Sequence, residues 1–366
     1  MSSIEPHRKP APLEAPIDAI LSPLNRFARN QAASGVLLGI AVIAALWAAN
    51  SSYGAIYDDL KHMQFAISAQ DWTLNMSLKH WINDGLMVLF FFLLGLEIKR
   101  ELLAGELQDL RQSGLVLCMA LGGMIVPALT YLGINSVTGA DAARGWGIPM
   151  ATDTAFAIGI LAALGTRVPK IAIVMVSALA IIDDIGAILV ISLFYTENID
   201  ITALAYAAAC LGGLVLLNVG GFRRHWPYLL FSVALWYCIL QSGVHATTAG
   251  VIAALAIPTR PHARTSWFSE RMSDILNSYK RAEDADRSIL EQGKQRELAM
   301  EAQSVATQVV TPLQRWEATL DKPVGLLIIP LFAFLNAGVE LPNNLSGVIS
   351  SPVSLAIMSG LVLGKS

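Results

Sequence analysis

The chain has 366 residues, of which 54% are hydrophobic and only 14% charged, and its mean hydropathy is +0.55. A soluble globular chain carries about 25% charged residues, so this composition excludes a soluble domain and favours a membrane protein. The net charge of −3 gives no support to a nucleic-acid partner or an acidic ligand. Cys118, Cys210 and Cys238 all lie in apolar stretches, so we expect no disulfide, no structural metal site and no cofactor.

A polar, proline-rich tail, residues 1–32, precedes the first apolar run. No small-residue cleavage site follows that run, so it is interpreted as a first membrane span and not as a removed signal peptide. A spanning helix needs roughly 20 apolar residues, and the chain holds about ten segments that reach or approach this length. They lie near 33–50, 84–99, 114–134, 150–165, 171–195, 202–219, 226–241, 244–257, 323–339 and 352–366. The sequence therefore predicts an all-α polytopic membrane domain over 33–366.

The lysines and arginines between the spans predict the orientation of the chain. They occur in the tail and then beside every second loop, at Arg8, Lys9, Arg26, Arg29, Lys99, Arg100, Arg111, Arg167, Lys170, Arg223, Arg224, Arg260 and Arg264. The loops in between hold few basic residues, and the segment 197–200 is acidic. By the positive-inside rule the N-terminal tail is cytoplasmic.

Two connections between spans are long. Residues 51–83, on the outside, alternate apolar and polar positions in two stretches, which predicts a β-hairpin or an interfacial segment. Residues 260–321, on the inside, are rich in charge and in helix-forming residues. We expect a solvated or surface-lying amphipathic helix there and not a separate domain.

The span near 150–165 has the pattern of an interrupted helix. Gly147 and Pro149 precede it, it carries Thr152, Asp153 and Thr154, and it holds only about 15 residues, too few to cross a bilayer as one unbroken helix. In transporters a short, interrupted hydrophobic segment is the best sequence indication of a binding site, because unwound backbone offers carbonyls and helix ends to an ion.

Asp183 and Asp184 stand side by side in the middle of the apolar run 171–195. Each carboxylate at the bilayer centre costs about 2.5–3.5 kcal/mol on insertion scales, against about 0.3–0.6 kcal/mol recovered per Leu or Ile. Such a pair is too costly to retain without a function, so the pattern favours an ion or proton site. Neighbouring helical residues point about 100° apart, so one carboxyl can face a cavity while the other meets a neighbouring helix.

Burial and an adjacent like charge both favour the protonated form of a carboxyl group, so we expect the pair to take up and release protons in coupled steps. A hard cation such as Na⁺ also prefers oxygen ligands. Protons and the cation would compete for the same oxygens, and competition at one site is sufficient for exchange. The alternative is that hydrogen bonds or a lysine satisfy both acids structurally.

Other ionisable positions have both a structural and a functional interpretation. Asp153 either neutralises helix ends where the chain unwinds or belongs to the site. Lys365 either anchors the membrane interface or pairs with one of the acids as a buried ammonium. His245, at the start of a span, is either a structural histidine or a group that titrates near pH 6.5. A last group has the pattern of a solvated helix end and comprises Glu97, Lys99, Arg100 and Glu101.

Several long sequence motifs are spread over most of the chain from about residue 25 onward. They are Asn-Asp-Gly-Leu-Met at 83–87, Gly-Leu-Glu-Ile-Lys-Arg-Glu-Leu at 95–102, Gly-Gly-Met-Ile-Val-Pro-Ala at 122–128, Ala-Thr-Asp-Thr-Ala-Phe-Ala at 151–157, Ala-Leu-Ala-Ile-Ile-Asp-Asp-Ile-Gly-Ala at 178–187, Ser-Gly-Val-His-Ala-Thr at 242–247 and Pro-Leu-Phe-Ala-Phe-Leu-Asn-Ala-Gly at 330–338. Together they resemble the motifs of the bacterial NhaA-type Na⁺/H⁺ antiporters.

The resemblance implies a multi-pass transporter of the bacterial inner membrane, with inverted repeats and interrupted helices, and not an enzyme. It implies electrogenic export of Na⁺ or Li⁺ in exchange for a larger number of protons. Asp183 and Asp184 match the residues that bind the cation and the protons in the family. Asp153, with Thr152, matches the acid at the unwound crossing. Lys365 matches the lysine that pairs with the first aspartate of the doublet.

The resemblance also implies regulation and assembly. Glu97, Arg100 and Glu101 match a cytoplasmic funnel linked to pH activation, and His245 matches a histidine also tied to the pH response. The outside loop 51–83 corresponds to a β-hairpin that forms a homodimer contact in the family.

The sequence departs from the family in three places. Well-studied members carry histidines in the pH-responsive segment before the ninth span, where a local match at 317–321 here has Ala318 and Asp321. The stretch 265–310 looks longer than usual. About 14 apolar residues follow Pro352, short of the roughly 20 a span needs. We therefore expect either a fragment or a naturally short chain that lacks the C-terminal spans and is inactive alone, because the partner of the interrupted Asp153 segment would be absent.

Two other classes of protein place acids within a bilayer. An intramembrane aspartyl protease has one aspartate on each of two facing helices, whereas here both acids are on one helix and the protease's Gly-x-Gly-Asp motif is absent. A passive cation or proton channel needs a continuous pore, with filter rings from symmetric subunits. Short, interrupted spans fit alternating access better than either alternative.

Overall fold

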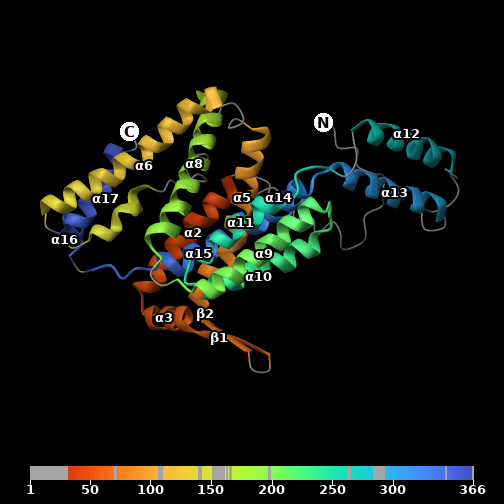
Figure 1. Ribbon diagram of the computed structural model, residues 1–366. Coiled ribbons are helices and arrows are strands. Elements are labelled where there is room, and N and C mark those ends of the chain that lie inside the picture. Colours follow the sequence, from red (N-terminus) through yellow and green to blue (C-terminus); the bar gives the residue numbers. More distant parts are fainter. Residues whose placement is uncertain are drawn as a thin grey trace, which may run out of the picture. The chain divides into compact units, whose positions relative to one another are not determined.

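A computed structural model describes residues 32–69, 72–105, 110–138, 142–150, 161, 164, 167–196, 199–261, 265–282, 293–342 and 344–364. Within these residues the chain is mainly helical and has a single two-stranded sheet (Figure 1). This is the all-α polytopic membrane architecture that the composition predicts. Thr152, Asp153 and Lys365 lie outside the described residues.

Four helices in the described part of the chain are long and apolar enough to cross a membrane: Leu78–Ala104, Leu117–Thr138, Ile201–Val219 and Pro312–Ala337. Helix α8 (Lys170–Phe194) has 25 residues, α10 (His225–Gln241) 17, α17 (Pro352–Gly364) 13 and α11 (Thr248–Ala256) only nine. Helices α2 (Ala32–Ala49) and α3 (Gly54–His62) form a further apolar pair, which is bent by 113°. Apart from the segment near 150–165, every predicted span coincides with a helix.

Two of the long spans contain a π-helical segment, a feature often found at functional positions. Segment η1 (Trp81–Leu86) leads into α5 (Met87–Ala104). Segment η4 (Val324–Ile328) joins α14 (Pro312–Pro323) to α15 (Ile329–Ala337), so the helix continues unbroken from the expected loop 260–321 into the span. Pro330 follows η4 and cannot donate a backbone hydrogen bond, which is consistent with irregular helical bonding there.

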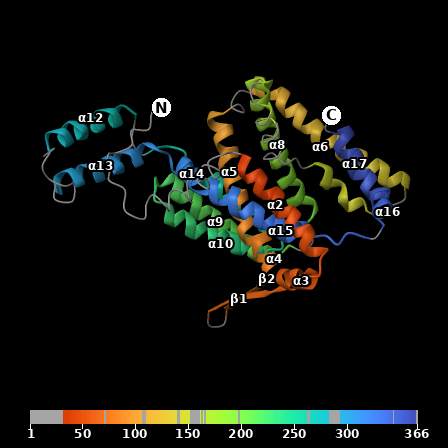
Figure 2. The same cartoon turned by 180° about the vertical axis from the view of Figure 1, so that it is seen from behind.

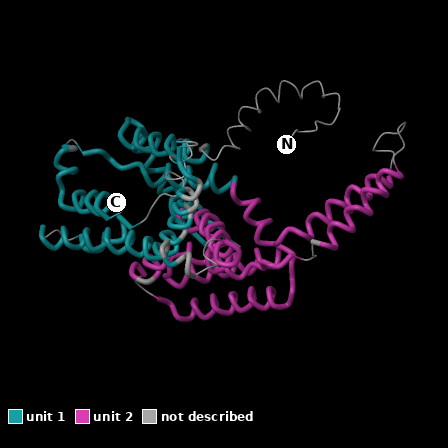
Figure 3. The backbone as a smooth tube through the Cα atoms, turned by 90° about the horizontal axis from the view of Figure 1, so that it is seen from above, with its two compact units in different colours: residues 1–82, 114–187, 322–366 teal, residues 83–113, 188–321 magenta. Residues whose placement is uncertain are grey.

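Contacts between residues divide the chain into two compact units (Figure 3). Unit 1 comprises residues 1–82, 114–187 and 322–366, and unit 2 comprises residues 83–113 and 188–321. The acidic doublet belongs to unit 1, and the charged cluster on α5 belongs to unit 2. Each unit is described separately below.

The loop 51–83, which the sequence predicts to be outside, contains a β-hairpin, the first of the two structures expected there. Strands β1 (Gln64–Ala69) and β2 (Trp72–Ser77) are antiparallel, with Phe65 opposite Met76 and Ile67 opposite Leu74. Trp81 donates its indole N–H to the carbonyl of Phe65 at 3.0 Å, which ties β1 to the start of the next span. Phe65 and Ile67 are about half exposed, at 46% and 54%, whereas their partners Met76 and Leu74 are buried, so only the β1 half of this apolar face is open.

In unit 1, Tyr57 of α3 and Asn50 contact the chain at the C-terminal end of α15. Tyr57 is buried; its hydroxyl donates to the carbonyl of Phe334 at 2.5 Å and its ring meets the Phe334 ring edge to face at 5.5 Å. Asn50 donates to the carbonyl of Val339 and accepts from the amide of Leu341. The last carbonyls of a helix have no partner within the helix, so these side chains replace the missing partner where α15 ends.

We expect Tyr57→Phe to lower the free energy of unfolding by about 0.5–1.5 kcal/mol, because the Phe334 carbonyl loses its donor while the ring packing remains. Tyr53→Phe is the matched control, since Tyr53 is 54% exposed. Thermal unfolding of the purified protein in detergent measures both. An equal effect of the two substitutions would contradict the role assigned to Tyr57.

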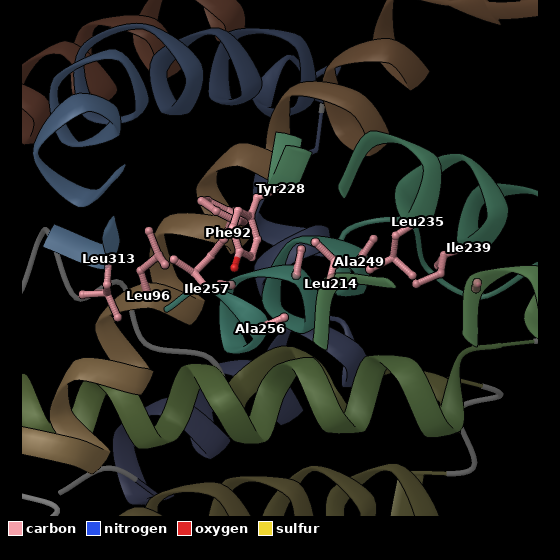
Figure 4. Packing of buried hydrophobic residues seen from close by; sticks show 13 residues of the cluster. Phe92, Leu96, Leu214, Tyr228, Leu235, Ile239, Ala249, Ala256, Ile257 and Leu313 are labelled. Carbon is pink, nitrogen blue, oxygen red and sulfur yellow. The ribbon is translucent and has the colours of Figure 1, made fainter. Parts of the chain in front are cut away.

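Unit 2 is built around a buried apolar cluster that α5, α9 (Ile201–Val219), α10, α11 and α14 share (Figure 4). Helices α9 and α10 form an antiparallel hairpin, and Gly221 takes a positive φ of 76° in the turn between them. Helix α11 lies against α5 because both carry glycines at the contact: a Cβ at Gly95 would be 2.7 Å from that of Ala254, and one at Gly250 would be 2.8 Å from the amide nitrogen of Phe92.

The inside connection of unit 2 is helical, as the sequence predicts. Helices α12 (Thr265–Arg281) and α13 (Gly293–Val309) lie side by side (Figures 1 and 2). Arg271 and Glu301 form an ion pair of 2.5 Å between them, and Ile275 and Val305 are buried. Most other side chains of the pair are polar or charged, although Trp267, Leu276 and Met300 are exposed, so it is an amphipathic helical hairpin.

Candidate ion-binding site

Helix α8 carries the acidic doublet within an apolar sequence that has no proline and a single glycine, Gly186. Asp183 is only 4% exposed, whereas Asp184 is partly exposed. The two side chains therefore have different environments, as their 100° separation on a helix predicts. In the described part of the chain no three His, Cys, Asp or Glu side chains gather as a metal-binding group.

Helix α6 (Leu110–Thr138) approaches α8 closely one turn from the doublet. Gly186 lies three residues after Asp183 and therefore on the same side of α8. A Cβ at Gly186 would collide with the side chain of Met124. It would overlap the sulfur and lie 2.9 Å from the methyl carbon. The glycine lets the Met124 side chain of α6 lie against the α8 backbone beside the acid.

Helix α17 packs against the same stretch of α6. A Cβ at Gly364, the last described residue of the chain, would lie 2.7 Å from the Cα of Pro127. A Cβ at Gly360 would lie 3.0 Å from Pro149 and 3.2 Å from the carbonyl oxygen of Pro127. Pro149 belongs to the 3₁₀ segment η2 (Ala143–Met150), which packs on α17. The three glycines, Gly186, Gly360 and Gly364, thus bring separate elements of unit 1 together.

The described neighbours of the predicted site residues converge on this part of α6. Asp183 is one helical turn from the contact between Gly186 and Met124. Met150, which is buried, is the last described residue before Thr152 and Asp153, and Gly364 directly precedes Lys365. In unit 1 the structure therefore brings α8, η2 and α17 together at α6. These segments carry or lead to the predicted ion-site residues, of which Thr152, Asp153 and Lys365 lie outside the described residues.

We expect Gly364→Ala to destabilise the fold, because overpacking against a rigid proline costs about 1–3 kcal/mol. Gly123→Ala on α6 is the matched control: nothing lies within 4 Å of a Cβ at that position. That control should be neutral or stabilise the protein by roughly 0.5–1 kcal/mol, because alanine is the better helix former. Melting temperatures of the two variants would measure the difference, and equal values would contradict the close contact at Pro127.

The charged cluster on α5 is held by unit 2 contacts that the sequence did not reveal. Arg100 pairs with Glu317 of α14 through a short contact, and its other terminal nitrogen lies 3.5 Å from Glu101. Lys99 donates to the carbonyls of Leu255 and Ile257, each at 2.6 Å. Arg100 thus joins α5 to α14, and Lys99 neutralises the exposed carbonyls and the negative dipole at the end of α11.

His245 does not join this cluster. It lies just before α11, and its carbonyl accepts from the backbone and the hydroxyl of Thr248 at 3.0 and 2.8 Å. Lys99 binds the opposite end of the same helix, roughly 13 Å away at 1.5 Å per residue. The predicted pH-response residues therefore fall into two groups at the two ends of α11: His245 at one end, and Glu97, Arg100 and Glu101 of α5 at the other.

The sequence-based prediction did not identify the residues that bind Lys99 and Arg100. Glu317 has no pattern that distinguishes it from other acids of the charged loop, and only its place in the local match at 317–321 singles it out. Lys99 was assigned to a solvated helix end, but the structure shows that its ammonium is bound to α11. A capping lysine that acts on another helix leaves no trace in the spacing of residues.

Comparison with known proteins assigns the class. The sequence profile of the family described as Na⁺/H⁺ antiporter 1 matches residues 25–366. The Na⁺/H⁺ antiporter NhaA 1 of Pseudoalteromonas atlantica is 53% identical over 98% of this chain and 76% of its own length. NhaA 1 of Shewanella denitrificans is 44% identical over 96% of this chain and 78% of its own length. The Na⁺/H⁺ antiporter NhaA of Oleidesulfovibrio alaskensis is 44% identical over 98% of this chain and 79% of its own length.

The polytopic helical membrane fold and these relatives assign the chain to the ion-transporting membrane proteins. Within that class, the chain belongs to the Na⁺/H⁺ antiporter 1 family. The resemblance drawn from the motifs is confirmed.

Proposed function

We propose that this protein exchanges intracellular Na⁺ or Li⁺ for external protons across the bacterial inner membrane, with its N-terminal tail in the cytoplasm. Family membership supports the exchange reaction and does not favour the alternative of an inactive fragment; the chain spans 76–79% of the length of these three relatives. The observation that carries the proposal is the doublet itself: Asp183 is buried and Asp184 is partly exposed in the middle of a 25-residue apolar helix. Only an ion or protons can neutralise such a pair repeatedly as the protein turns over.

The proposed mechanism is competition for the carboxylate oxygens of the doublet. With one Na⁺ bound, the ionised pair keeps a net charge of −1. If each carboxyl binds a proton instead, the pair is neutral. The two loaded forms differ in charge, so a complete cycle moves charge across the membrane, and exchange is electrogenic. Asp184, being more exposed, is the group that we expect the ion to reach first.

Asp153, Thr152 and Lys365 are proposed to support the site. Their role is supported by the packing of their described neighbours, Met150 and Gly364, in segments that meet α6 beside α8. Lys365 would pair with Asp183 when the pair carries no cation, since an ammonium offsets the cost of a buried carboxylate. Asp153 would cap helix ends at the interrupted segment.

The proposed regulation places the pH response on the α5 cluster and on His245. Glu97, Arg100 and Glu101 are within one turn of each other on α5, and Arg100 joins them to Glu317. Charge changes in this group act on α14 and hence on the span that continues from it. Through this coupling the exchanger would contribute to pH homeostasis.

We expect Asp183→Asn and Asp184→Asn each to abolish exchange without unfolding the protein, because the amide keeps the shape but binds neither the proton nor the cation. Proteoliposomes with an imposed Na⁺ gradient and an internal pH dye measure whether Na⁺ drives protons uphill, which a passive leak cannot do. Asp59→Asn, on an exposed position of α3, is the matched control. Normal exchange by Asp184→Asn would contradict the proposal.

Asp153→Asn should reduce exchange less than either doublet variant, because a neutral amide can still cap helix ends. The same proteoliposome assay measures it. Loss as complete as that of Asp183→Asn would assign Asp153 to ion binding itself.

The hairpin is the proposed contact of a homodimer. Phe65 and Ile67 share one outward face of β1, whereas Asn75 of β2 lies opposite Ala66 on the other face. Ile67→Glu should convert dimers to monomers, and Asn75→Glu should not, because only the first substitution places a charge in the apolar contact. Molar mass in detergent by light scattering measures the oligomeric state. Dimers that survive Ile67→Glu would exclude this surface.

A further inference from the structure

Helix α2 of unit 1 has an exposed apolar stripe along one side. Its members recur every three or four residues, the spacing that places side chains on the same face of a helix. They are Val36, Ile40, Ile43 and Trp47, and they are 48% to 69% exposed. Helix α2 has 18 residues and is roughly 27 Å long at 1.5 Å per residue, so it can cross most of a hydrocarbon core alone. In a membrane protein such a stripe is covered by lipid chains.

A second apolar stripe, the α3 stripe, lies on the next helix and continues the first. Its members recur at the same intervals and are Tyr53, Ile56, Leu60 and Met63. Leu60 is partly exposed, and the other three are 49% to 66% exposed. The rings of Trp47 and Tyr53 lie 5.8 Å apart and join the two stripes at the bend between the helices. The lipid-covered surface of α2 is therefore continuous with the α3 stripe.

The remaining sides of α3 have different surroundings. Tyr57 is buried against Phe334 of α15. Asp58 and His62, one helical turn apart, are exposed on the side opposite the α3 stripe. The Nζ atom of Lys61 lies between these two sides, 2.9 Å from the Asp58 carboxylate and 4.8 Å from the centre of the Tyr57 ring. Helix α3 thus has an open apolar side, a side packed on protein and a polar side.

Helix α3 does not continue the crossing that α2 begins. The chain bends by 113° between the two helices, as can be followed in Figure 2. Four of the nine residues of α3 are acidic or basic, and such residues are costly in the hydrocarbon core. The α3 stripe, in contrast, is costly to leave in water. The membrane–water interface satisfies both conditions, because there one side of a helix meets acyl chains and the other side meets water.

We propose that α3 lies in the membrane–water interface at the end of α2, with the α3 stripe in contact with lipid and Asp58 in water. Trp47 and Tyr53 belong to the residue types that favour this depth. Two acids and one lysine give α3 no excess of positive charge, so the contact depends on apolar burial and not on anionic headgroups. The leaflet that receives α3 rests on the proposed orientation of the chain, but its depth does not. An anchored α3 holds Tyr57 against the end of α15.

The test is the depth of nitroxide labels on the 366-residue protein in phosphatidylcholine vesicles. Ile56→Cys places a label on the α3 stripe, and Asp58→Cys, the matched control, places one on the opposite side of the same helix. The background carries Cys118→Ala, Cys210→Ala and Cys238→Ala. Oxygen collects in lipid, whereas a nickel chelate stays in water. We expect the ratio of oxygen to nickel collision rates to be several-fold higher at position 56 than at position 58.

Met63→Cys repeats the measurement at a second position of the α3 stripe and should agree with position 56. Equal access of the nickel chelate to positions 56 and 58 would show a solvated helix and overturn the proposal. Shielding of position 56 from both reagents would assign the α3 stripe to contact with a second copy of the chain and would also overturn it. A lipid depth that appears only when phosphatidylglycerol is added would contradict contact by apolar burial. Na⁺-driven proton movement by the same samples tests the exchange function separately.

Discussion

In a bilayer a charged side chain must find its partners inside the protein, because neither water nor lipid can supply them. Asp183 is subject to this constraint on α8, because only 4% of its surface is exposed. Elements of unit 1 approach one another through small residues: Gly186 of α8 admits Met124 of α6, and Gly360 and Gly364 of α17 admit Pro149 and Pro127. A methyl group at Gly364 would collide with the backbone and ring of Pro127, whereas one at Gly186 would require the Met124 side chain to move. The environment of the acid pair thus depends on close helix packing as much as on the acids themselves.

The same constraint acts on the ends of the helices. Helix α15 ends against Tyr57 and Asn50, and α11 ends on the ammonium of Lys99. In both cases side chains from other helices supply the donors that terminal carbonyls lack. Segment η1 follows the rule too, since the carbonyl of Asp84 accepts from the indole of Trp236 at 2.5 Å. Short and irregular helices are stable here because their neighbours complete their hydrogen bonding.

Helix α14 makes two kinds of contact with its neighbours. Its polar side meets α5 through the pair of Glu317 and Arg100, and its apolar side meets α5 and α10 through Trp316. The first contact is an ion pair, and the second places the Trp316 ring between those of Phe92 and His225. The helix then runs without interruption to Ala337.

The sequence by itself determined the class, the placement of the helices and the hairpin, and the position of Asp183 and Asp184 on α8. These properties follow from hydrophobicity, segment length and the period of the pattern, which are local. The tertiary structure alone decided that Arg100 meets Glu317, that Lys99 caps α11 and that His225 rests on Trp316. Each of these contacts joins residues more than 90 positions apart, and its geometry is set by how helices pack. Hydropathy cannot reveal it, because a charged or aromatic residue near a helix end looks the same in sequence whether water or another helix receives it.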